Sequence, residues 1–576
     1  MKRKINVSQK RELADLIIQN AKIADVFNLR WRKGNLVIAD GKIIAIDENN
    51  EFKAHEVVDA EGRHVVPGLI DAHIHIESSM LTPSQFNRIM LPHGITAIVT
   101  DPHEIANVAG KTGLEFMLND SQNVEMDIYY MLPSSVPGTS FENAGAILKA
   151  EELAEFVGHK SILGLAEVMD FPAVLNGEDD MLAKIQLAQN AGMVIDGHCA
   201  GLNSAQIRGY RAAGIVTDHE CVSAEEALDR IEQGMYVLMR EGSAAKNVKA
   251  ILPAVTPANA RRFAFCTDDK HLDELIEEGS INYAVALAIA EGMEPLQAIQ
   301  IASLNAAECY RLKDKGALAT GYEADFIVLE DLQSMKAATV WKNGKKVAEN
   351  GVMLTPTPEK SVVVPSILQS MHLPKLVAKD FAIPFKGNKA NVIQIVPNQL
   401  ITKRMITKVD VENGFFMPSI KKDLLKLAVI ERHHNLGTKG VAIVHGIGIQ
   451  RGAVATTIAH DSHNAIVVGT NDTDMVIALE ALQAMQGGLV IVDQGKVLAS
   501  LSLPIGGIMT DAVAEEAKEA LQKLHDALHI IHPTIDYHLF LTLSFLALPV
   551  IPDIKLTDTG LFDVTAFKHI PVEIEA

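Results

Sequence analysis

Short apolar runs alternate with stretches of helical hydrophobic spacing from Gly68 to about Gly316. The runs have the length and composition of buried strands. The stretches between them, such as Leu182–Ala191 and Ala224–Gln233, have helical periodicity and often end at glycine. The pattern predicts eight strands, at Leu69–His75, Ile95–Thr100, Asp127–Leu132, Ile162–Glu167, Met193–His198, Ile215–His219, Tyr236–Arg240 and Arg262–Asp268. Eight strands alternating with helices over roughly 250 residues are typical of one α/β fold, the (β/α)8 barrel of the TIM type.

The segments on either side of this region have a different pattern. Residues 14–66 contain alternating strands joined by Asp-Gly-type turns, as in Gly34–Ile46. Ala324–Leu329 and Thr339–Val347 continue the same style after the barrel. We therefore expect a small β-sandwich assembled from residues 1–66 and 317–358, beside a barrel at 67–316.

A proline-rich stretch, Thr355–Pro358 followed by Val364-Pro365, predicts a linker. We expect a separate C-terminal α/β domain at 359–576. Its predicted elements are strands at Val441–Ile449 and Ala465–Gly469, a helix at Asp474–Met485, and a buried helix at Leu539–Ile551 that is too short to span a membrane.

Composition narrows the class of protein. A chain of 576 residues needs more than one core, and 48% hydrophobic with 22% charged residues is typical of a globular protein. The net charge of −20 argues against nucleic acid or an anionic membrane as the main partner. The four cysteines lack C-x-x-C spacing and the N-terminus lacks a secretory pattern, so we expect a cytoplasmic protein without disulfides.

The stretch Pro67–Glu77 carries the most informative polar residues. Its alternation places Ile70, Ala72, Ile74 and Ile76 on one face and Asp71, His73, His75 and Glu77 on the other. Two imidazoles and a carboxylate on a buried strand are costly unless something binds them. A divalent metal ion is the usual ligand of such a group.

Polar residues at the ends of other predicted strands share this register. They are Asp101, His103, Glu167, His198, His219 and Asp268. Barrel enzymes build their active sites at the carboxyl ends of the strands. Core histidines satisfied by backbone carbonyls are the alternative, but they would not follow one register.

Four histidines, one glutamate and one aspartate can hold two metal ions and a bridging hydroxide. A bound divalent ion lowers the pKa of water from 15.7 toward about 7. Asp268 could ligate one metal and also accept the proton of that water. This chemistry is hydrolysis at an electrophilic carbon. The P-C-x-x-C motif of the zinc deaminases is absent.

Pro67–His75 resembles the amidohydrolase superfamily, and the longer run His73–Met80 is similar to the adenine deaminase family within it. Further segments carry the same resemblance: Asp101–Gly110, Asp196–Gly201, Thr217–Glu220, Cys266–Asp269 and Ala459–Gly469. The resemblance implies a set of metal ligands: His73, His75, Glu167, His198, His219 and Asp268. It also implies two divalent ions, with Mn(2+) preferred and Fe(2+) or Zn(2+) as alternatives. Glu167 stands where many amidohydrolases have a carbamylated lysine.

The activity implied by the resemblance is hydrolysis of adenine to hypoxanthine and ammonia, a step of purine salvage. Hydroxide would attack C6, Asp268 would act as the base, and Glu77 or Glu167 would protonate N1. Glu77, Asp101, His103 and Glu104 are candidate substrate contacts, although His103 and Glu104 could equally be a solvated loop pair.

Some alternatives stay open from the sequence. The chain could be a hydrolase of cyclic amides, a deaminase of a different base, or a non-catalytic scaffold. The histidine-rich tracts Glu431–Asn435 and His460–Asn464 could bind another metal or form polar contacts between domains. A small purine base is the expected partner, and a homodimer the expected assembly.

Overall fold

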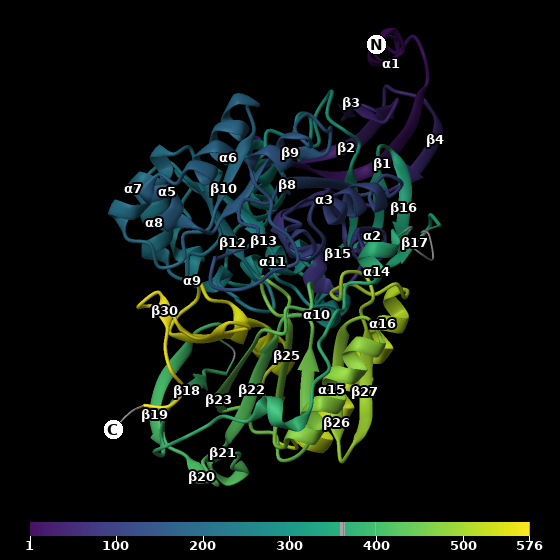
Figure 1. Ribbon diagram of the computed structural model, residues 1–576. Coiled ribbons are helices and arrows are strands. Elements are labelled where there is room, and N and C mark those ends of the chain that lie inside the picture. The colour runs from purple at the N-terminus through teal and green to yellow at the C-terminus, as the bar shows by residue number, and fades with distance from the viewer. Residues whose placement is uncertain (357–360, 362, 398, 575–576) are drawn as a thin grey trace.

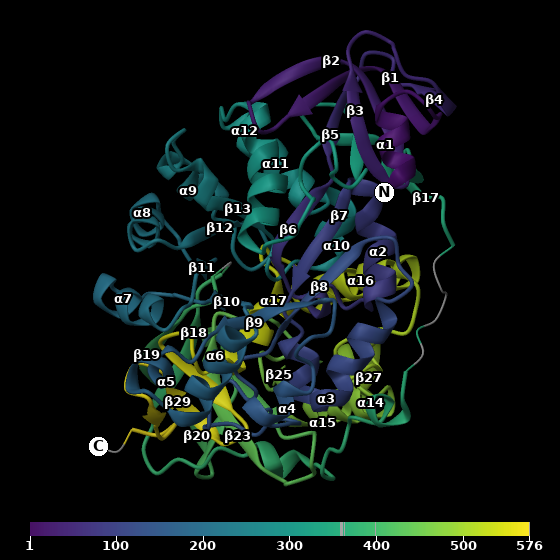
Figure 2. The same ribbon diagram turned by 90° about the horizontal axis from the view of Figure 1, so that it is seen from above.

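A computed structural model describes residues 1–356, 361, 363–397 and 399–574 (Figure 1). Figures 1 and 2 both place a sheet of N-terminal strands and a C-terminal group of strands and helices on different sides of a central α/β region. The predicted boundary at 358/359 lies outside the described residues. No helix within the described ranges has the length and apolarity needed to cross a membrane.

The central region contains two parallel sheets that join edge to edge and together form one curved parallel sheet. The first, in spatial order β10-β9-β8-β7-β6, consists of β6 (Leu69–Ile74), β7 (Ile95–Thr100), β8 (Asp127–Leu132), β9 (Ile162–Val168) and β10 (Val194–Gly197). The second consists of β11 (Thr217–Asp218), β12 (Tyr236–Arg240) and β13 (Phe263–Cys266).

Backbone hydrogen bonds join the two sheets at both edges. Val216 N–H donates to Ile195 O at 3.0 Å on one side. Asp268 N–H donates to His73 O at 2.9 Å on the other. The curled parallel arrangement of a TIM-type barrel is therefore confirmed, and each predicted strand has a counterpart. The last predicted strand ends early because Asp268 has a left-handed φ of 57°, which breaks the extended backbone.

The barrel strands are buried on both faces, as strands of a parallel sheet are. In β7, Ala97 and Val99 belong to one apolar cluster, whereas Ile95 and Ile98 belong to another. The helices of this region are α2 (Pro83–Met90), α3 (His103–Asp120), α4 (Ala150–Ala154), α5 (Phe171–Asn176), α6 (Asp179–Asn190), α7 (Ser204–Ala212), α8 (Ala224–Glu232), α9 (Val248–Ile251), α10 (Leu272–Glu278), α11 (Ile281–Ala290), α12 (Pro295–Gln300) and α13 (Ala306–Cys309).

A nine-stranded sheet draws its strands from both flanks of the barrel, preceded by α1 (Lys2–Ser8). Its strands are β1 (Ala14–Asp25), β2 (Arg30–Ala39), β3 (Lys42–Asp47), β4 (Ala54–Asp59), β5 (His64–Pro67), β14 (Phe326–Asp331), β15 (Lys336–Lys342), β16 (Lys345–Glu349) and β17 (Val352–Met353). The two halves meet where β5 pairs antiparallel with β14, with Val66 opposite Ile327.

The C-terminal part is centred on an eight-stranded sheet in the order β19-β18-β23-β22-β25-β24-β26-β27. These strands are β18 (Lys389–Ile395), β19 (Thr402–Lys408), β22 (Leu424–Ile430), β23 (Lys439–His445), β24 (Ala453–Thr456), β25 (Ala465–Gly469), β26 (Gly488–Asp493) and β27 (Lys496–Ser502). The smaller strands are β20 (Asp410–Glu412), β21 (Phe415–Met417), β28 (Ile554–Thr557), β29 (Gly560–Asp563) and β30 (Lys568–His569). The helices are α14 (Pro365–Leu368), α15 (Asp472–Ala484), α16 (Ala514–Ile531) and α17 (Leu539–Ser544).

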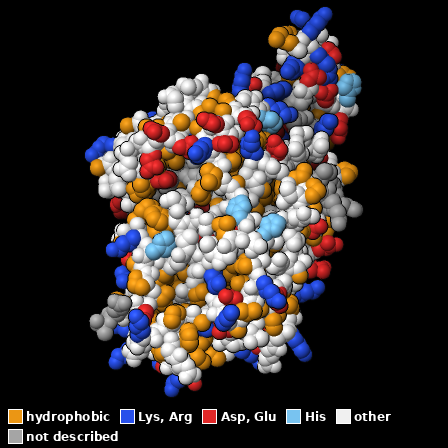
Figure 3. Space-filling view, in the orientation of Figure 1, with side chains coloured by type: hydrophobic (Ala, Val, Ile, Leu, Met, Phe, Trp, Pro, Cys, Tyr) orange, Lys and Arg blue, Asp and Glu red, His pale blue; other side chains and the backbone are white. Residues whose placement is uncertain are grey.

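The elements predicted from the sequence of this part are present, with two differences. The strand predicted at Val441–Ile449 ends at His445, because Gly446 and Gly448 have left-handed φ values of 99° and 78°. The predicted helix at Leu539–Ile551 is α17 followed by a single 3-10 turn at Phe545–Ala547, after which the chain leaves the helical conformation. Figure 3 shows charged side chains of both signs interspersed on one face of the molecule, with several histidines near the level where the barrel meets the C-terminal part.

Candidate active site

The six ligands implied by the resemblance lie together at the carboxyl ends of the barrel strands. His73 and His75 come from β6 and the residue after it, Glu167 from β9, and the others from the residues just after β10, β11 and β13. His198 is the most exposed of them, with 17% of its side chain accessible. The arrangement agrees with the register expected from the sequence.

Glu167 lies between two pairs of histidines. Its Oε1 is 3.3 Å from His75 Nε2 and 3.8 Å from His73 Nε2. Its Oε2 is 2.8 Å from His198 Nδ1 and 3.2 Å from His219 Nε2. One carboxylate therefore presents one oxygen to each pair, so Glu167 would be able to hold a cation on each side.

Asp268 completes the group on the side of His73 and His75. Its Oδ1 is 2.9 Å from His75 Nε2 and 3.5 Å from His73 Nε2. Its Oδ2 accepts a hydrogen bond from Arg240. Burial favours the neutral acid, but the Arg240 guanidinium and the two imidazoles outweigh burial and hold the pKa of Asp268 well below its usual value.

Arg240 and Glu220 were not predicted from the sequence. Arg240 Nη1 donates to Glu220 Oε1 at 2.5 Å, and Glu220 Oε1 is 3.4 Å from His219 Nε2. Both residues stand at strand ends in the same register as the ligands. That register could have identified them, but a lone arginine and a glutamate beside histidine are ordinarily solvated.

The site fits divalent metal ions on the evidence of its own side chains. His73 is 1% exposed, and neither of its ring nitrogens has a hydrogen-bond partner among the residues that the structure describes. His219 Nδ1 is likewise buried without a partner in that part of the chain. Burial disfavours a charged imidazole, yet the surrounding carboxylates of Asp196, Asp268 and Glu167 raise the pKa of His73 to about 10. The pocket therefore favours positive charge, and its nitrogen and oxygen donors suit a divalent cation.

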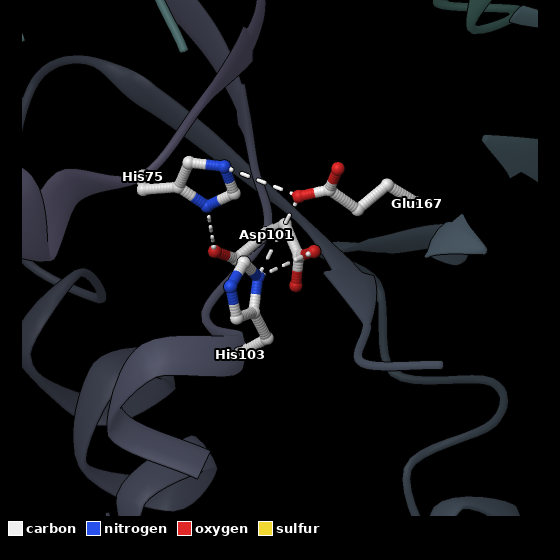
Figure 4. A group of neighbouring side chains, drawn as sticks. All are labelled: His75, Asp101, His103 and Glu167. Atoms are coloured by element: carbon white, nitrogen blue, oxygen red, sulfur yellow. Dashed lines mark hydrogen bonds and ion pairs between the residues drawn. The ribbon is translucent and has the colours of Figure 1, made fainter. Parts of the chain in front are cut away.

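Asp101 orients two of the neighbouring imidazoles (Figure 4). His75 Nδ1–H donates to the backbone oxygen of Asp101 at 3.0 Å, so in the neutral ring Nε2 is the free nitrogen and faces Glu167 and Asp268. His103 Nδ1 contacts Asp101 Oδ2 at 3.0 Å and lies 3.7 Å from Glu167 Oε1. Asp101 and His103 therefore adjoin the ligand group directly.

Glu77 lies buried just beyond His75. Its Oε1 accepts the Ile105 N–H at 3.2 Å, and its Oε2 has no hydrogen-bond partner among the described residues. Burial raises the pKa of Glu77 to about 7. A carboxyl group with this pKa can be protonated near neutral pH and can donate a proton.

Glu104 faces the C-terminal part. Its two oxygens contact His460 Nδ1 and His463 Nε2, and one ligand atom from each of the three residues lies close enough to the others to hold a metal. However, Ala459 N–H donates to His463 Nδ1 at 3.2 Å, which places the proton of a neutral His463 on Nε2, facing Glu104. This contact favours a hydrogen-bonded link between barrel and C-terminal part over a metal site.

The other histidine-rich tract also makes polar contacts. His433 Nε2 donates to Ser462 O at 2.7 Å, and His434 Nε2 donates to Ala144 O at 3.1 Å. Glu431 Oε1 accepts the backbone N–H groups of both histidines at 2.6 Å. These contacts fix the loop that packs against the barrel.

A cavity of about 850 Å³ opens beside the ligand group. Its wall includes His198, the loop 134–141 after β8, residues 169–173 after β9, and parts of the segment 550–567 from the C-terminal region. A volume of this size can accommodate a small organic substrate next to the candidate metal centre.

A parallel barrel with histidines and carboxylates at its strand ends is the arrangement of a metal-dependent hydrolase, and residues 64–347 match the family model described as "Amidohydrolase family". Residues 399–568 match the model "Adenine deaminase C-terminal domain". The chain is 63% identical to an adenine deaminase of Lysinibacillus sphaericus (strain C3-41) over 98% of this chain and 97% of that protein. The chain therefore belongs to the adenine deaminase family.

Other relatives extend the comparison. An adenine deaminase of Halalkalibacterium halodurans is 49% identical over 100% of this chain and 99% of its own length. Among solved structures, an enamidase of the amidohydrolase superfamily is similar with a TM-score of 0.46 and 19% identity, covering 60% of this chain and 98% of that chain.

Proposed function

We propose that the protein hydrolyses adenine to hypoxanthine and ammonia. The observation that carries the proposal is the position of Glu167, with one carboxylate oxygen toward each of two histidine pairs, together with membership of the adenine deaminase family. A site that would hold two cations side by side suits hydrolytic displacement of an amino group from a purine ring.

The residues present divide into two ligand sets. His73, His75 and Asp268 Oδ1 lie around Glu167 Oε1, whereas His198 and His219 lie around Glu167 Oε2. Divalent ions bound there would supply hydroxide near neutral pH. We propose Mn(2+) as the resident ion, with Fe(2+) and Zn(2+) as alternatives that the same donors accept.

The chain's own acids and bases account for the proton transfers. Asp268 has one oxygen beside the histidines and the other bound to Arg240, so it is placed to accept a proton from the attacking water. Attack at C6 moves electrons onto N1, which needs a proton donor. Glu77, buried and with a raised pKa, suits that donor, with Glu167 as the alternative.

His103 and Asp101 are proposed to border the bound base. His103 lies between Glu167 Oε1 and the C-terminal residue Asp461, whose Oδ1 is 3.8 Å from His103 Nε2. Both oxygens of Glu104 contact histidines of the C-terminal part, so its proposed role is to hold this side of the site in place.

The test is ammonia release from adenine, guanine, adenosine and cyclic amides by metal-reconstituted protein. We expect adenine to be preferred and to yield hypoxanthine. Better turnover of one of the other compounds would contradict the proposed substrate.

Elemental analysis tests the metal centre separately. We expect about two ions per subunit, and metal loss in His73→Ala and His198→Ala proteins. His55→Ala, which removes an exposed histidine of β4, is the control and should keep the wild-type content. Unchanged content in both site variants would refute the ligand assignment.

Finer features of the fold and assembly belong to the same proposal. We propose that residues 1–66 and 317–358 form a β-sandwich, that the barrel spans 67–316, and that 359–576 is an α/β domain. We also propose a cytoplasmic homodimer that acts on a small purine and binds neither nucleic acid nor membrane. Light scattering of the purified protein measures the assembly.

A further inference from the structure

A second cavity, of about 510 Å³, lies where the barrel meets the C-terminal part. Its wall combines the start of α10, the last turns of α16 and the segment 535–541 that leads into α17. Both views show α10 and α16 side by side (Figures 1 and 2). This cavity shares no lining residue with the cavity that contains His198, so it is separate from the candidate active site.

Imidazoles and carboxylates make up most of the charged and titratable groups of this wall. Four histidines line the cavity (His271, His525, His529 and His538), together with three aspartates, of which Asp273 belongs to α10. Among its lining residues in the described part of the chain, none is a lysine or an arginine. The wall therefore favours a cation over an anion. Nitrogen donors beside carboxylates suit zinc-class transition metals, whereas Mg(2+) prefers oxygen donors alone.

His525 and Asp273 face each other across the junction of the two parts. Nε2 of His525 is 4.0 Å from Oδ2 of Asp273, which is too far for a hydrogen bond. Oδ1 of Asp273 accepts the Glu274 backbone N–H at 3.0 Å, so Oδ2 is the oxygen that remains for a ligand. Two donors about 2.1 Å from a tetrahedral zinc ion are roughly 3.4 Å apart. The two side chains, 38% and 24% exposed, can reach that spacing by a small movement.

The helix α16 supplies a second imidazole on the same side. His529 follows His525 by about one turn, and both side chains line the cavity. Residues at this spacing lie on one face of a helix, with Cβ atoms about 5–6 Å apart. Two histidines at positions i and i+4 of a helix are a recurring ligand pair for zinc. The cavity therefore has two nitrogen donors from α16 and one carboxylate donor from α10.

His538 is less suited to the same ion. Its Nε2 lies 4.0 Å from Oε1 of Glu274. Glu274 is already engaged, because its Oε2 accepts a hydrogen bond from Ser243 at 2.6 Å and its Oε1 accepts one from Lys246 at 3.0 Å. His538 is therefore a matched control: it is a histidine of the same cavity whose neighbouring carboxylate is occupied.

We propose that this cavity binds one divalent transition-metal ion of the zinc class, with His525, His529 and Asp273 as its protein ligands. Water completes the coordination, as in other zinc sites with three protein ligands. The bound ion links α10 of the barrel to α16 of the C-terminal part. The inference concerns a different site from the one at the strand ends and is independent of the reaction proposed there.

The experiment is equilibrium dialysis of protein without a histidine tag against a series of free Zn(2+) concentrations. At equal free zinc, wild-type protein should bind one ion per subunit more than His525→Ala or Asp273→Asn protein. His529→Ala, which keeps two ligands, should raise the Kd of that ion by roughly tenfold or more. His538→Gln should bind as much as wild type. With Mg(2+) in place of Zn(2+), wild type and variants should not differ.

Two further measurements separate this site from the barrel centre. The difference of one ion should persist when His525→Ala is compared in a His73→Ala background, where the barrel ligands are incomplete. Zinc above the concentration that fills the barrel should raise the melting temperature of wild type but not of His525→Ala protein. Folding of the variants is expected, because the three side chains are partly or fully exposed, and circular dichroism checks it.

Equal zinc content in wild-type, His525→Ala and Asp273→Asn proteins at every free zinc concentration would overturn the inference. Loss of the same ion in His538→Gln protein would overturn the ligand assignment. Failure of the protein to release ammonia from adenine would bear on the proposed function alone.

Discussion

Arg240 binds Oδ2 of Asp268 and leaves Oδ1 of the same carboxylate facing the histidines of β6. Arg240 is 4% exposed and its guanidinium also binds Glu220, so it cannot turn away without leaving two carboxylates unpaired. Arg240 therefore fixes which oxygen of Asp268 is available for chemistry. A carboxylate held in this way needs no rearrangement before it takes up the proposed role of ligand and base.

Replacing Asp268 by asparagine should remove most turnover while leaving the fold intact. An amide can occupy the same place but cannot accept a proton, and loss of a general base costs about 10²–10⁴-fold in rate. The measurement is kcat at matched metal content, with circular dichroism as the check on folding. Near-wild-type kcat in fully metallated protein would place the base elsewhere.

Glu77→Gln should also lower kcat, because an amide cannot deliver a proton to N1. The loss should match that of Asp268→Asn if Glu77 is the acid, and should be smaller if Glu167 is. Metal content should stay at the wild-type level, since Glu77 is outside the candidate ligand set and its Oε1 accepts the Ile105 N–H. A variant with unchanged kcat would exclude Glu77 from the proton transfer.

Arg240→Gln should destabilise the protein strongly, because it leaves the buried carboxylate of Asp268 and the partly buried carboxylate of Glu220 without the guanidinium that pairs with them. Breaking a buried ion pair costs about 3–5 kcal/mol. Thermal unfolding compares it with Arg88→Gln, which breaks an exposed pair with Glu515 and should cost at most about 1 kcal/mol. Equal decreases in melting temperature in the two variants would show that Arg240 stabilises the protein no more than an exposed ion pair does.

Lys555 should make stability depend on pH. Its Nζ donates to Leu400 O at 2.8 Å and Phe545 O at 2.9 Å, and burial lowers its pKa from 10.5 to about 7. Between these two values the unfolded chain binds a proton that the folded protein does not, so stability rises with pH across that window.

The comparison is with Lys555→Met, which removes this titration. The melting temperature of wild type relative to the variant should increase from pH 7 to pH 9. Lys568→Met, at an exposed position of β30, serves as the control and should show no such change. A parallel pH response of wild type and Lys555→Met would contradict the lowered pKa.

Glu104→Gln should loosen the contact between barrel and C-terminal part. The change removes the charge that raises the pKa of His460 to about 9, against the opposing effect of burial. Hydrogen exchange should increase in the segment 458–464 and stay unchanged in β1. No change in exchange would mean that other contacts hold this segment.

The sequence was most informative where a repeating pattern determines position. Strand ends of a parallel barrel share one edge, so His73, Glu167 and Asp268 could be grouped without knowing any distance. The pattern was less informative where contacts connect distant parts of the chain. Glu104 and His460 are 356 residues apart, and no periodicity relates them.

Charged residues without a motif were also missed. Arg240 and Glu220 follow the strand register, but their pairing depends on the barrel closing. The irregular loop around Asn143 packs against the C-terminal part, where Asn143 Nδ2 donates to the carboxylate of Asp558 at 2.6 Å. Such positions follow from tertiary structure and not from local propensity.

The pairing of β5 with β14 has a consequence for biosynthesis. β14 begins about 260 residues after β5, and at 5–20 residues per second its synthesis follows roughly 13–50 s later. During that interval the nascent chain exposes the unpaired edge of β5, a template for wrong pairing. The whole barrel is therefore synthesised before β14 can pair with β5 and complete the flanking sheet. We expect chaperones to bind the growing chain at the unpaired edge of β5.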